Sequence, residues 1–279
     1  MAARLALAVA VITGALRLAL PFSPAEAIPR EAPLSFVSAR LLGGFRVALA
    51  DVLWTQAQAD LDRKAFLGLP ARYRLIATLQ PESARVWIYN AWNLAYNIPA
   101  LYAESPEAQW EWIRRGHDFL REGLRANPGD VWILAELGLL FERRIRQHPV
   151  LEARARVFLR GRDPLLEARD WFERASAAAK GLPDPADRYH QGSLWLEVAA
   201  ACEMERAERA MRLGDRAAAL SSNRGALSRL RRRLVEFPLD GPGIPEPERV
   251  RGTDVVRNRI PELKRRIAAL EAAPGKGTR

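Results

Sequence analysis

Apolar and polar positions along most of this chain follow the spacing expected of helices. Long stretches are dense in Ala, Leu, Arg and Glu, which favour helix, and runs of β-branched residues are few. Near the end of the chain, Leu263, Ile267 and Leu270 would share one helical face, with the basic residues 264–266 largely elsewhere. The pattern predicts an all-α fold in which residues 260–272 form one last amphipathic helix.

Two of the predicted helices repeat the same pattern. Residues 86–96 align without gaps with residues 131–141, and both segments begin with Val-Trp-Ile and end with an aromatic residue. Each follows a turn marked by proline, Gln-Pro-Glu-Ser at 80–83 and Asn-Pro-Gly-Asp at 127–130. Because proline interrupts a helix while Ser and Asp cap the next one, these turns should separate consecutive helices. Internal repetition of this kind predicts a helical-repeat protein.

The repeated segments resemble the tetratricopeptide repeat (TPR) family. In that family the first helix carries large, large, small and aromatic residues, and the second carries small, large, small and large residues followed by proline. The first-helix positions are matched by Leu134, Leu137, Gly138 and Phe141, and the second-helix positions by Gly116, Leu120, Gly123, Leu124 and Pro128. Small residues at a helix crossing let the neighbouring helix approach, and bulky residues fill the space beside them. The resemblance implies a TPR-like α-solenoid.

Partial matches extend the resemblance over roughly residues 45–238. They are Leu53, Trp54 and Ala57 with Tyr73, Ala77 and Pro81; Ala168, Phe172 and Ala175; and Gly214 with Ala219, Ala226 and Leu227. The spacing between the two Val-Trp-Ile triplets is longer than the repeat of about 34 residues usual in the family. The connection at residues 147–164 is longer still.

The N-terminus carries an apolar segment, residues 5–22, interrupted only by Arg17. It is just long enough to span a membrane as an N-terminal hydrophobic helix. It also has the parts of a signal peptide, with an apolar core at 5–16 and an Ala-Glu-Ala cleavage site at 25–27. Pro21 and Pro24 lie between these parts, which favours the uncleaved anchor. Arginines flank the segment on both sides and leave its orientation open.

These features divide the chain into five segments. They are a transmembrane anchor or signal peptide at 1–27, a linker at 28–44, the TPR-like domain at 45–238, a Pro- and Gly-rich linker at 239–258, and a C-terminal helix and tail at 259–279. Residues 42–54, with Gly-Phe-Arg followed by Ala-Asp-Val-Leu-Trp, also resemble uncharacterised bacterial membrane-anchored TPR proteins. That resemblance implies a membrane anchor and brings no known activity with it.

The net charge of +10 and the pI near 10.5 raise the question of an anionic partner. Nearly all of the positive charge is arginine, which is typical of a GC-rich genome and of surface drift. Arg229, Arg232 and Arg233 would share a helical face and form a candidate basic patch for anionic lipid or nucleic acid. The simpler interpretation is an arginine-rich helix end that complements the helix dipole, so nucleic acid is not the expected partner.

The sequence lacks the common catalytic, nucleotide-binding and metal-binding motifs. No G-x-S-x-G, Walker loop or G-x-G-x-x-G occurs, and His117, His148 and His190 lack the spacing of metal ligands. The single cysteine, Cys202, lies among alanines and is expected to be a small buried helix residue. We therefore expect no catalytic residues, no metal and no cofactor, and we predict that the protein is not an enzyme.

The TPR resemblance also implies a concave groove lined by first-helix residues. Transferred onto the matching positions, it predicts a partner-binding groove of Trp54, Gln58, Trp87, Asn90, Asn97, Trp132 and Glu142. The tryptophans would supply apolar contact area, and the asparagines would hydrogen-bond the backbone of a bound peptide. The alternative is that the two asparagines only satisfy neighbouring carbonyl groups.

Taken together, these patterns predict a non-enzymatic, membrane-associated scaffold or adaptor that binds a protein or peptide in the groove of a TPR-like solenoid. The alternative is an electrostatic binder that uses its arginine-rich C-terminal third. Because long domains are translocated largely regardless of charge, we expect the body on the periplasmic side, either anchored or exported after signal cleavage. Assembly into a larger complex is compatible with this prediction.

Overall fold

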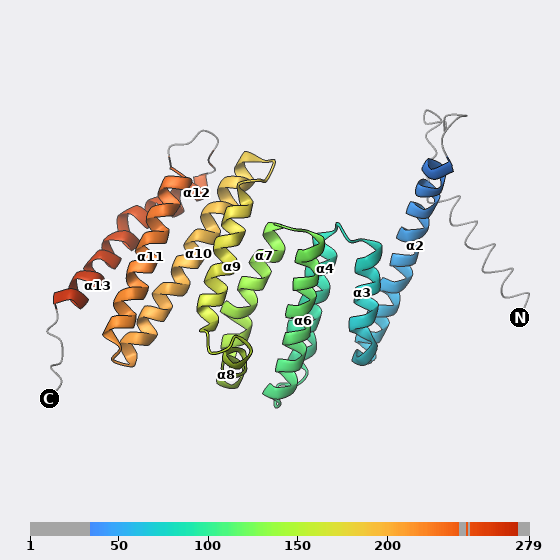
Figure 1. The fold of residues 1–279 in the computed structure, drawn as a ribbon, viewed down its shortest axis with the longest axis horizontal. Coiled ribbons are helices and arrows are strands. Elements are labelled where there is room, and N and C mark those ends of the chain that lie inside the picture. Colours follow the sequence, from blue (N-terminus) through green and yellow to red (C-terminus); the bar gives the residue numbers. More distant parts are fainter. Residues whose placement is uncertain (1–33, 240–243, 245, 273–279) are drawn as a thin grey trace, which may run out of the picture. The chain divides into compact units, whose positions relative to one another are not determined.

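The computed structural model describes residues 34–239, 244 and 246–272, with side chains described from residue 45 onward. These residues form helices joined by short turns, and no strand occurs among them (Figure 1). The prediction of an all-α fold is confirmed. The chain divides into two compact units, Met1–Leu49 and Ala50–Arg279, and the packing described here belongs to the second unit.

The helical elements follow one another with few residues between them. In chain order they are α2 (Leu34–Asp62), η1 (Phe66–Gly68), α3 (Leu69–Leu79), α4 (Ala84–Trp92), η2 (Asn93–Asn97), α5 (Ile98–Ala100), α6 (Pro106–Ala126), α7 (Val131–Leu139), η3 (Leu140–Arg144), η4 (Ile145–Gln147), α8 (Pro149–Phe158), α9 (Pro164–Ala179), α10 (Pro185–Arg212), α11 (Arg216–Glu236), α12 (Glu246–Asp254), η5 (Val255–Arg259) and α13 (Ile260–Ala272).

Helices pack chiefly against others that are close to them in the sequence. The α4 helix packs against α6 and α7, α7 packs against α9, and α10 lies between α9 and α11. The α13 helix closes the series by packing against α11. Its apolar face is the predicted one, because Leu263 and Leu270 are buried and Ile267 packs beside them. The predicted amphipathic helix at 260–272 is therefore confirmed.

Proline, aspartate and serine mark the helix starts, as the turn signals predicted. Side chains of Asp130, Asp163, Asp184, Asp215 and Ser105 accept hydrogen bonds from backbone N–H groups of the first helical turn. Ser83 also precedes a helix, α4, but its side chain makes no capping bond. The turns at 80–83 and 127–130 do separate consecutive helices, α3 from α4 and α6 from α7.

Glycines inside helices permit the closest helix contacts. A Cβ atom on Gly138 of α7 would lie 2.6 Å from the ring of Phe172 in α9. One on Gly123 of α6 would lie 2.7 Å from Trp87 in α4. One on Gly116 would lie equally close, at 2.7 Å, to Cβ of Ala95. The small positions taken from the TPR pattern therefore lie at helix crossings, where no side chain fits.

Two segments predicted as linkers contain helix. The α2 helix begins at Leu34, within the segment 28–44, and α12 and η5 occupy much of the segment 239–258. The η5 segment that continues α12 is stabilised by burial, because its Val255 packs into the same cluster as Leu230 and Leu263. Proline near the start of α12 is compatible with a first helical turn, so Pro247 does not prevent this helix.

No helix among the described residues is both long enough and apolar enough to span a membrane. The apolar stretch at residues 5–22 lies outside the described residues. The prediction of an anchor or signal peptide therefore concerns a part of the chain that the structure does not describe.

We expect Gly138→Ala to lower the free energy of unfolding by about 1–3 kcal/mol, because its methyl group would overlap the fully buried ring of Phe172. The usual gain in helix propensity from glycine to alanine, about 0.5–1 kcal/mol, would be too small to offset that overlap. Urea unfolding followed by circular dichroism measures the change.

Gly68→Ala is the matched control for this substitution. A Cβ atom on Gly68 would meet nothing within 4 Å, and the backbone there is right-handed. We expect Gly68→Ala to leave the stability unchanged or slightly raised. Equal losses in the two variants would show that the glycine contact does not hold α7 against α9.

Candidate partner-binding site

Two of the helices that carry the predicted groove end in π-helical turns. The α4 helix continues into η2, and α7 continues into η3. Buried Arg144 of η3 fixes the two turns to each other, because its Nε donates to the carbonyl of Ala95 in η2 at 3.1 Å. A second bond, from Nη2 to Oε1 of Gln109, holds the same guanidinium on α6 at 3.0 Å. Turns of this type are frequent at functional sites.

The two tryptophans of the repeated Val-Trp-Ile triplets lie in different surroundings. Trp87 is 7% exposed, packs on Gly123 and donates Nε1–H to the carbonyl of Pro81, whereas Trp132 is 48% exposed. The helix starts explain this difference, because Trp87 lies four residues after its cap Ser83 and Trp132 only two after Asp130. A shift of two residues turns a side chain by about 200° around the helix.

The other predicted groove residues also divide between interior and surface. Asn90 is fully buried, and neither polar atom of its side chain has a partner. Glu142 is ion-paired with Arg143 at 3.2 Å. Gln58 and Asn97 are exposed and line one cavity together, and Trp54 is partly exposed beside them on α2. The accessible part of the predicted groove therefore consists of Trp54, Gln58, Asn97, Trp132 and Glu142.

An aromatic face extends over α2, α4 and α7, and we define it as Trp54, Tyr89, Trp92, Tyr96 and Trp132. Trp54 meets Tyr89 edge to face with ring centroids 5.4 Å apart, and Trp92 stacks on Tyr96 at 6.0 Å. Tyr89, Trp92 and Tyr96 follow one another at three- and four-residue spacing along α4 and η2. Trp132 lies on α7, which packs against α4.

An amide pocket of about 320 Å³ adjoins this face, and it is lined by Gln58, Leu61, Asp62, Phe66, Tyr89, Asn93, Asn97, Ile98 and Leu101. Its hydrogen bonds are local: Gln58 donates to Asp62 at 2.9 Å, and Asn97 donates to Oδ1 of Asn93 at 2.7 Å. Asn93 is 2% exposed and its Nδ2 has no partner. A buried donor without a partner is costly, so this amide is a local weakness in the wall of the pocket.

The carboxylate of Glu136 lies next to the aromatic face. It is near enough to Tyr96 for the two groups to interact electrostatically, and burial together with this carboxylate raises the pKa of the Tyr96 hydroxyl. Burial also raises the pKa of Glu136, although Arg143 partly counteracts it. A half-buried carboxylate in this position gives the site one acceptor that is poorly solvated.

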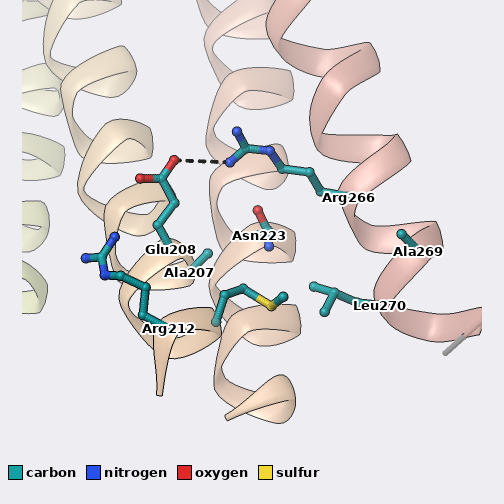
Figure 2. A pocket seen from close by; sticks show the side chains of 8 residues that line it. Ala207, Glu208, Arg212, Asn223, Arg266, Ala269 and Leu270 are labelled. Atoms are coloured by element: carbon teal, nitrogen blue, oxygen red, sulfur yellow. Dashed lines mark hydrogen bonds and ion pairs between the residues drawn. The ribbon is translucent and has the colours of Figure 1, made fainter. Parts of the chain in front are cut away.

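Two further cavities are less suited to a partner. One, of about 570 Å³, includes His117 and balances guanidinium groups of Arg74, Arg121 and Arg125 with carboxylates of Asp118, Glu122 and Glu167. The other, of about 560 Å³, lies between α10, α11 and α13 (Figure 2). Glu208 and Arg266 point toward one another across it at 3.3 Å, so this cavity belongs to the packing of α13.

The three arginines of the predicted basic patch are each paired with a carboxylate. Arg233 is fully buried and donates to Glu197 at 2.9 Å and to the carbonyl of Phe237, also at 2.9 Å. Arg229 and Arg232 share Glu173, at 2.5 and 3.4 Å. The guanidinium groups thus join α11 to α9 and α10, and much of their charge is neutralised within the fold.

The single cysteine, Cys202, is a buried free thiol. Burial raises the pKa of the Cys202 thiol to about 12, because the thiolate is poorly solvated there. Within residues 45–239, 244 and 246–272, no group of His, Cys, Asp and Glu side chains is arranged to hold a metal ion. Comparison with known proteins finds no family model that matches the chain and no significantly similar curated protein.

We expect Glu136→Gln to raise the free energy of unfolding at pH 7. The pKa of Glu136 is higher in the folded chain than in the unfolded chain, so ionisation opposes folding. In the parent protein, the destabilisation by ionised Glu136 sets in as pH rises above the pKa of the unfolded chain, about 4.3. The difference between Glu136→Gln and the parent protein should therefore shrink when urea unfolding is repeated below about pH 4.

Asp170→Asn is a control with the opposite sign. Burial tends to raise the pKa of Asp170, but hydrogen bonds from Arg162 and Arg169 outweigh it and lower the pKa. Its contribution to stability is present above the unfolded pKa and disappears as pH falls through the lower folded pKa. Asp170→Asn should therefore be less stable than the parent protein at pH 7. If Glu136→Gln behaves in the same way, Glu136 is not desolvated at the site.

Proposed function

We propose that this chain is a non-enzymatic, membrane-associated adaptor with TPR-like helical repeats that binds a protein or peptide partner. The observation that carries the proposal is the aromatic face beside the amide pocket. Trp54 pairs there with Tyr89 and Trp92 with Tyr96, and Trp132 is 48% exposed on the neighbouring α7, while other tryptophans, such as Trp110 and Trp171, are buried in the core. Exposed aromatic clusters of this kind are typical of interaction surfaces.

Support for a repeat architecture comes from the order of the helix contacts. Neighbouring helices pack in sequence order, and the glycines of the TPR-like pattern lie at their crossings. Stacked helical repeats create extended concave binding surfaces. We infer that the aromatic face, whose residues come from α2, α4 and α7, belongs to such a surface, where a repeat protein binds its partner.

The alternative, an electrostatic binder of lipid or nucleic acid, has less support. Its candidate residues, Arg229, Arg232 and Arg233, are occupied by Glu173, Glu197 and Glu236. A group already paired in this way releases fewer counterions when it meets a phosphate. The membrane part of the proposal rests on the apolar residues 5–22, with the body on the periplasmic side.

We expect Trp92→Ala to abolish binding of the partner while the fold stays intact. Trp92 is 44% exposed, so its truncation costs little in the core, whereas aromatic anchors commonly contribute about 2 kcal/mol or more to binding. Affinity capture of the full chain from native membranes, followed by mass spectrometry, should show a protein that is recovered with the parent chain and lost with Trp92→Ala.

Leu213→Ala is the matched control, because Leu213 is an exposed apolar residue at the end of α10, outside the aromatic face. It should retain the partner. A partner that is kept by Trp92→Ala would show that the aromatic face is not the binding site. A partner lost by raising the salt concentration, but not by Trp92→Ala, would favour the electrostatic alternative.

A further inference from the structure

The carboxylate of Glu136 on α7 is partly buried, yet it makes no hydrogen bond and no ion pair with any residue that the structure describes. Its oxygens still reach solvent, because neither belongs to the fully buried, unpartnered side-chain atoms of this part of the chain. Burial raises the pKa of the group, so its ionised form is poorly solvated where it lies. A cation from outside the chain would therefore stabilise it.

Guanidinium groups of two arginines lie near the aromatic face, but both are bonded elsewhere. Arg143 is close enough to Glu136 to counteract part of the rise in its pKa, yet its Nε donates to Glu142 at 3.2 Å. Arg144 is buried, and its donors are used by one backbone carbonyl and two glutamine side chains. Neither arginine therefore contacts the carboxylate of Glu136.

Aromatic rings flank this carboxylate from two neighbouring elements. On α7, Trp132 lies one turn before Glu136, at the four-residue spacing that brings helical side chains together. On η2, Tyr96 is close enough to Glu136 for an electrostatic interaction, and the ring of Trp92 stacks on that of Tyr96. Trp92 is 44% exposed and Trp132 is 48% exposed, so both rings are accessible to a ligand. We define Trp92, Tyr96, Trp132 and Glu136 as the acidic aromatic site.

Aromatic rings attract cations to their faces, and this chain uses that attraction elsewhere. Arg174 lies over the ring of Trp171, with its Cζ 4.2 Å from the ring centroid. No arginine or lysine of residues 45–239, 244 and 246–272 lies in this way over a ring of the acidic aromatic site. The site thus combines ring faces with a negative charge that the described residues leave without a cation.

We propose that the acidic aromatic site binds an arginine side chain of the partner, with the guanidinium against the rings and bonded to Glu136. This inference rests on the proposed function and specifies the chemistry that the partner presents. Arginine suits the site better than lysine, because its planar guanidinium stacks on aromatic rings and is more weakly hydrated than an ammonium group. Its fork of N–H donors also bonds both oxygens of a carboxylate. An acidic or apolar segment would leave Glu136 without a partner, so charge complementarity favours the basic one.

The probes are three short blocked peptides that are identical except at one central position. That position holds arginine, lysine or citrulline, which keeps the shape of arginine without its charge, and the other positions hold glycine, serine and leucine. Isothermal titration calorimetry with the purified full chain should show the tightest binding for the arginine peptide. The citrulline peptide should bind about tenfold more weakly, with the lysine peptide between the two.

Glu136→Gln removes the charge of the site and keeps the size of the side chain. It should weaken the arginine peptide about tenfold and leave the citrulline peptide unchanged, which is the coupling that a double-mutant cycle measures. Since we expect this variant to be more stable than the parent protein, loss of fold does not account for its loss of binding. The matched control is Glu246→Gln, because Glu246 is an exposed carboxylate at the start of α12, outside the site. It should bind all three peptides as the parent protein does.

Three results of the titrations would overturn the inference. They are equal affinities of the parent protein for the arginine and citrulline peptides, arginine-peptide binding that Glu136→Gln leaves unchanged, and tighter binding of the lysine peptide. Failure of all three peptides to bind at about 1 mM would overturn it as well.

Capture from native membranes separates this inference from the proposed function. Glu136→Gln should recover much less of the partner than Glu246→Gln does. A partner lost with Trp92→Ala but fully kept with Glu136→Gln would overturn the arginine ligand and leave the aromatic face as the binding site. A partner kept by both variants would overturn both proposals.

Discussion

The close approach of packed helices at glycines is the constraint on which the rest of this structure depends. Gly116 and Gly123 let α6 lie against α4 and η2, and Gly138 lets α7 lie against Phe172 of α9. A helix held at such a crossing cannot rotate without driving a side chain into its neighbour. Each crossing therefore decides which residues of a helix are buried and which face outward, and the aromatic face consists of those that face outward.

The parts of the fold that could be predicted from the sequence are those with local sequence signals. The turns at 80–83 and 127–130, the helix at 260–272 and the small positions Gly116, Gly123 and Gly138 are local signals, and each is found in the structure. The segment 239–258 was less predictable, because its helix depends on burial of Val255 against residues far along the chain. Local composition there indicates a linker, but tertiary packing favours helix.

The candidate site could be predicted only in part, and the reason lies in helix rotation. The identical Val-Trp-Ile triplets suggested equivalent roles for Trp87 and Trp132, but the two helices start at different distances from them. Sequence reasoning missed Tyr89, Trp92 and Tyr96, although their spacing along one side of a helix was visible. Counting from the cap Ser83 rather than aligning the triplets would have placed them on the outer side.

Charge was harder to interpret from the sequence than apolar pattern. The run around Arg231 offered a candidate basic patch, yet Arg229 and Arg233 pair with carboxylates far away in the sequence, on α9 and α10. Ion pairing is a tertiary property, and a local run of arginine does not reveal it. Arg233 and Glu197 are both buried, so loss of either partner would leave an uncompensated charge in the core.

The π-helical turns connect the core of the protein with its candidate site. A π turn shifts the residues that follow it around the helix axis and leaves carbonyl groups without their usual partners. Arg144 donates to one carbonyl of this turn, at Ala95, while the same turn carries the exposed Asn97 and Tyr96 of the aromatic face. The polar group that stabilises the irregular backbone is buried, and the polar group left unpartnered, Nδ2 of Asn93, lines the amide pocket. The turn therefore has one of its backbone carbonyls satisfied by an arginine from a distant helix, while one of its own side-chain donors stays without a partner in the interior.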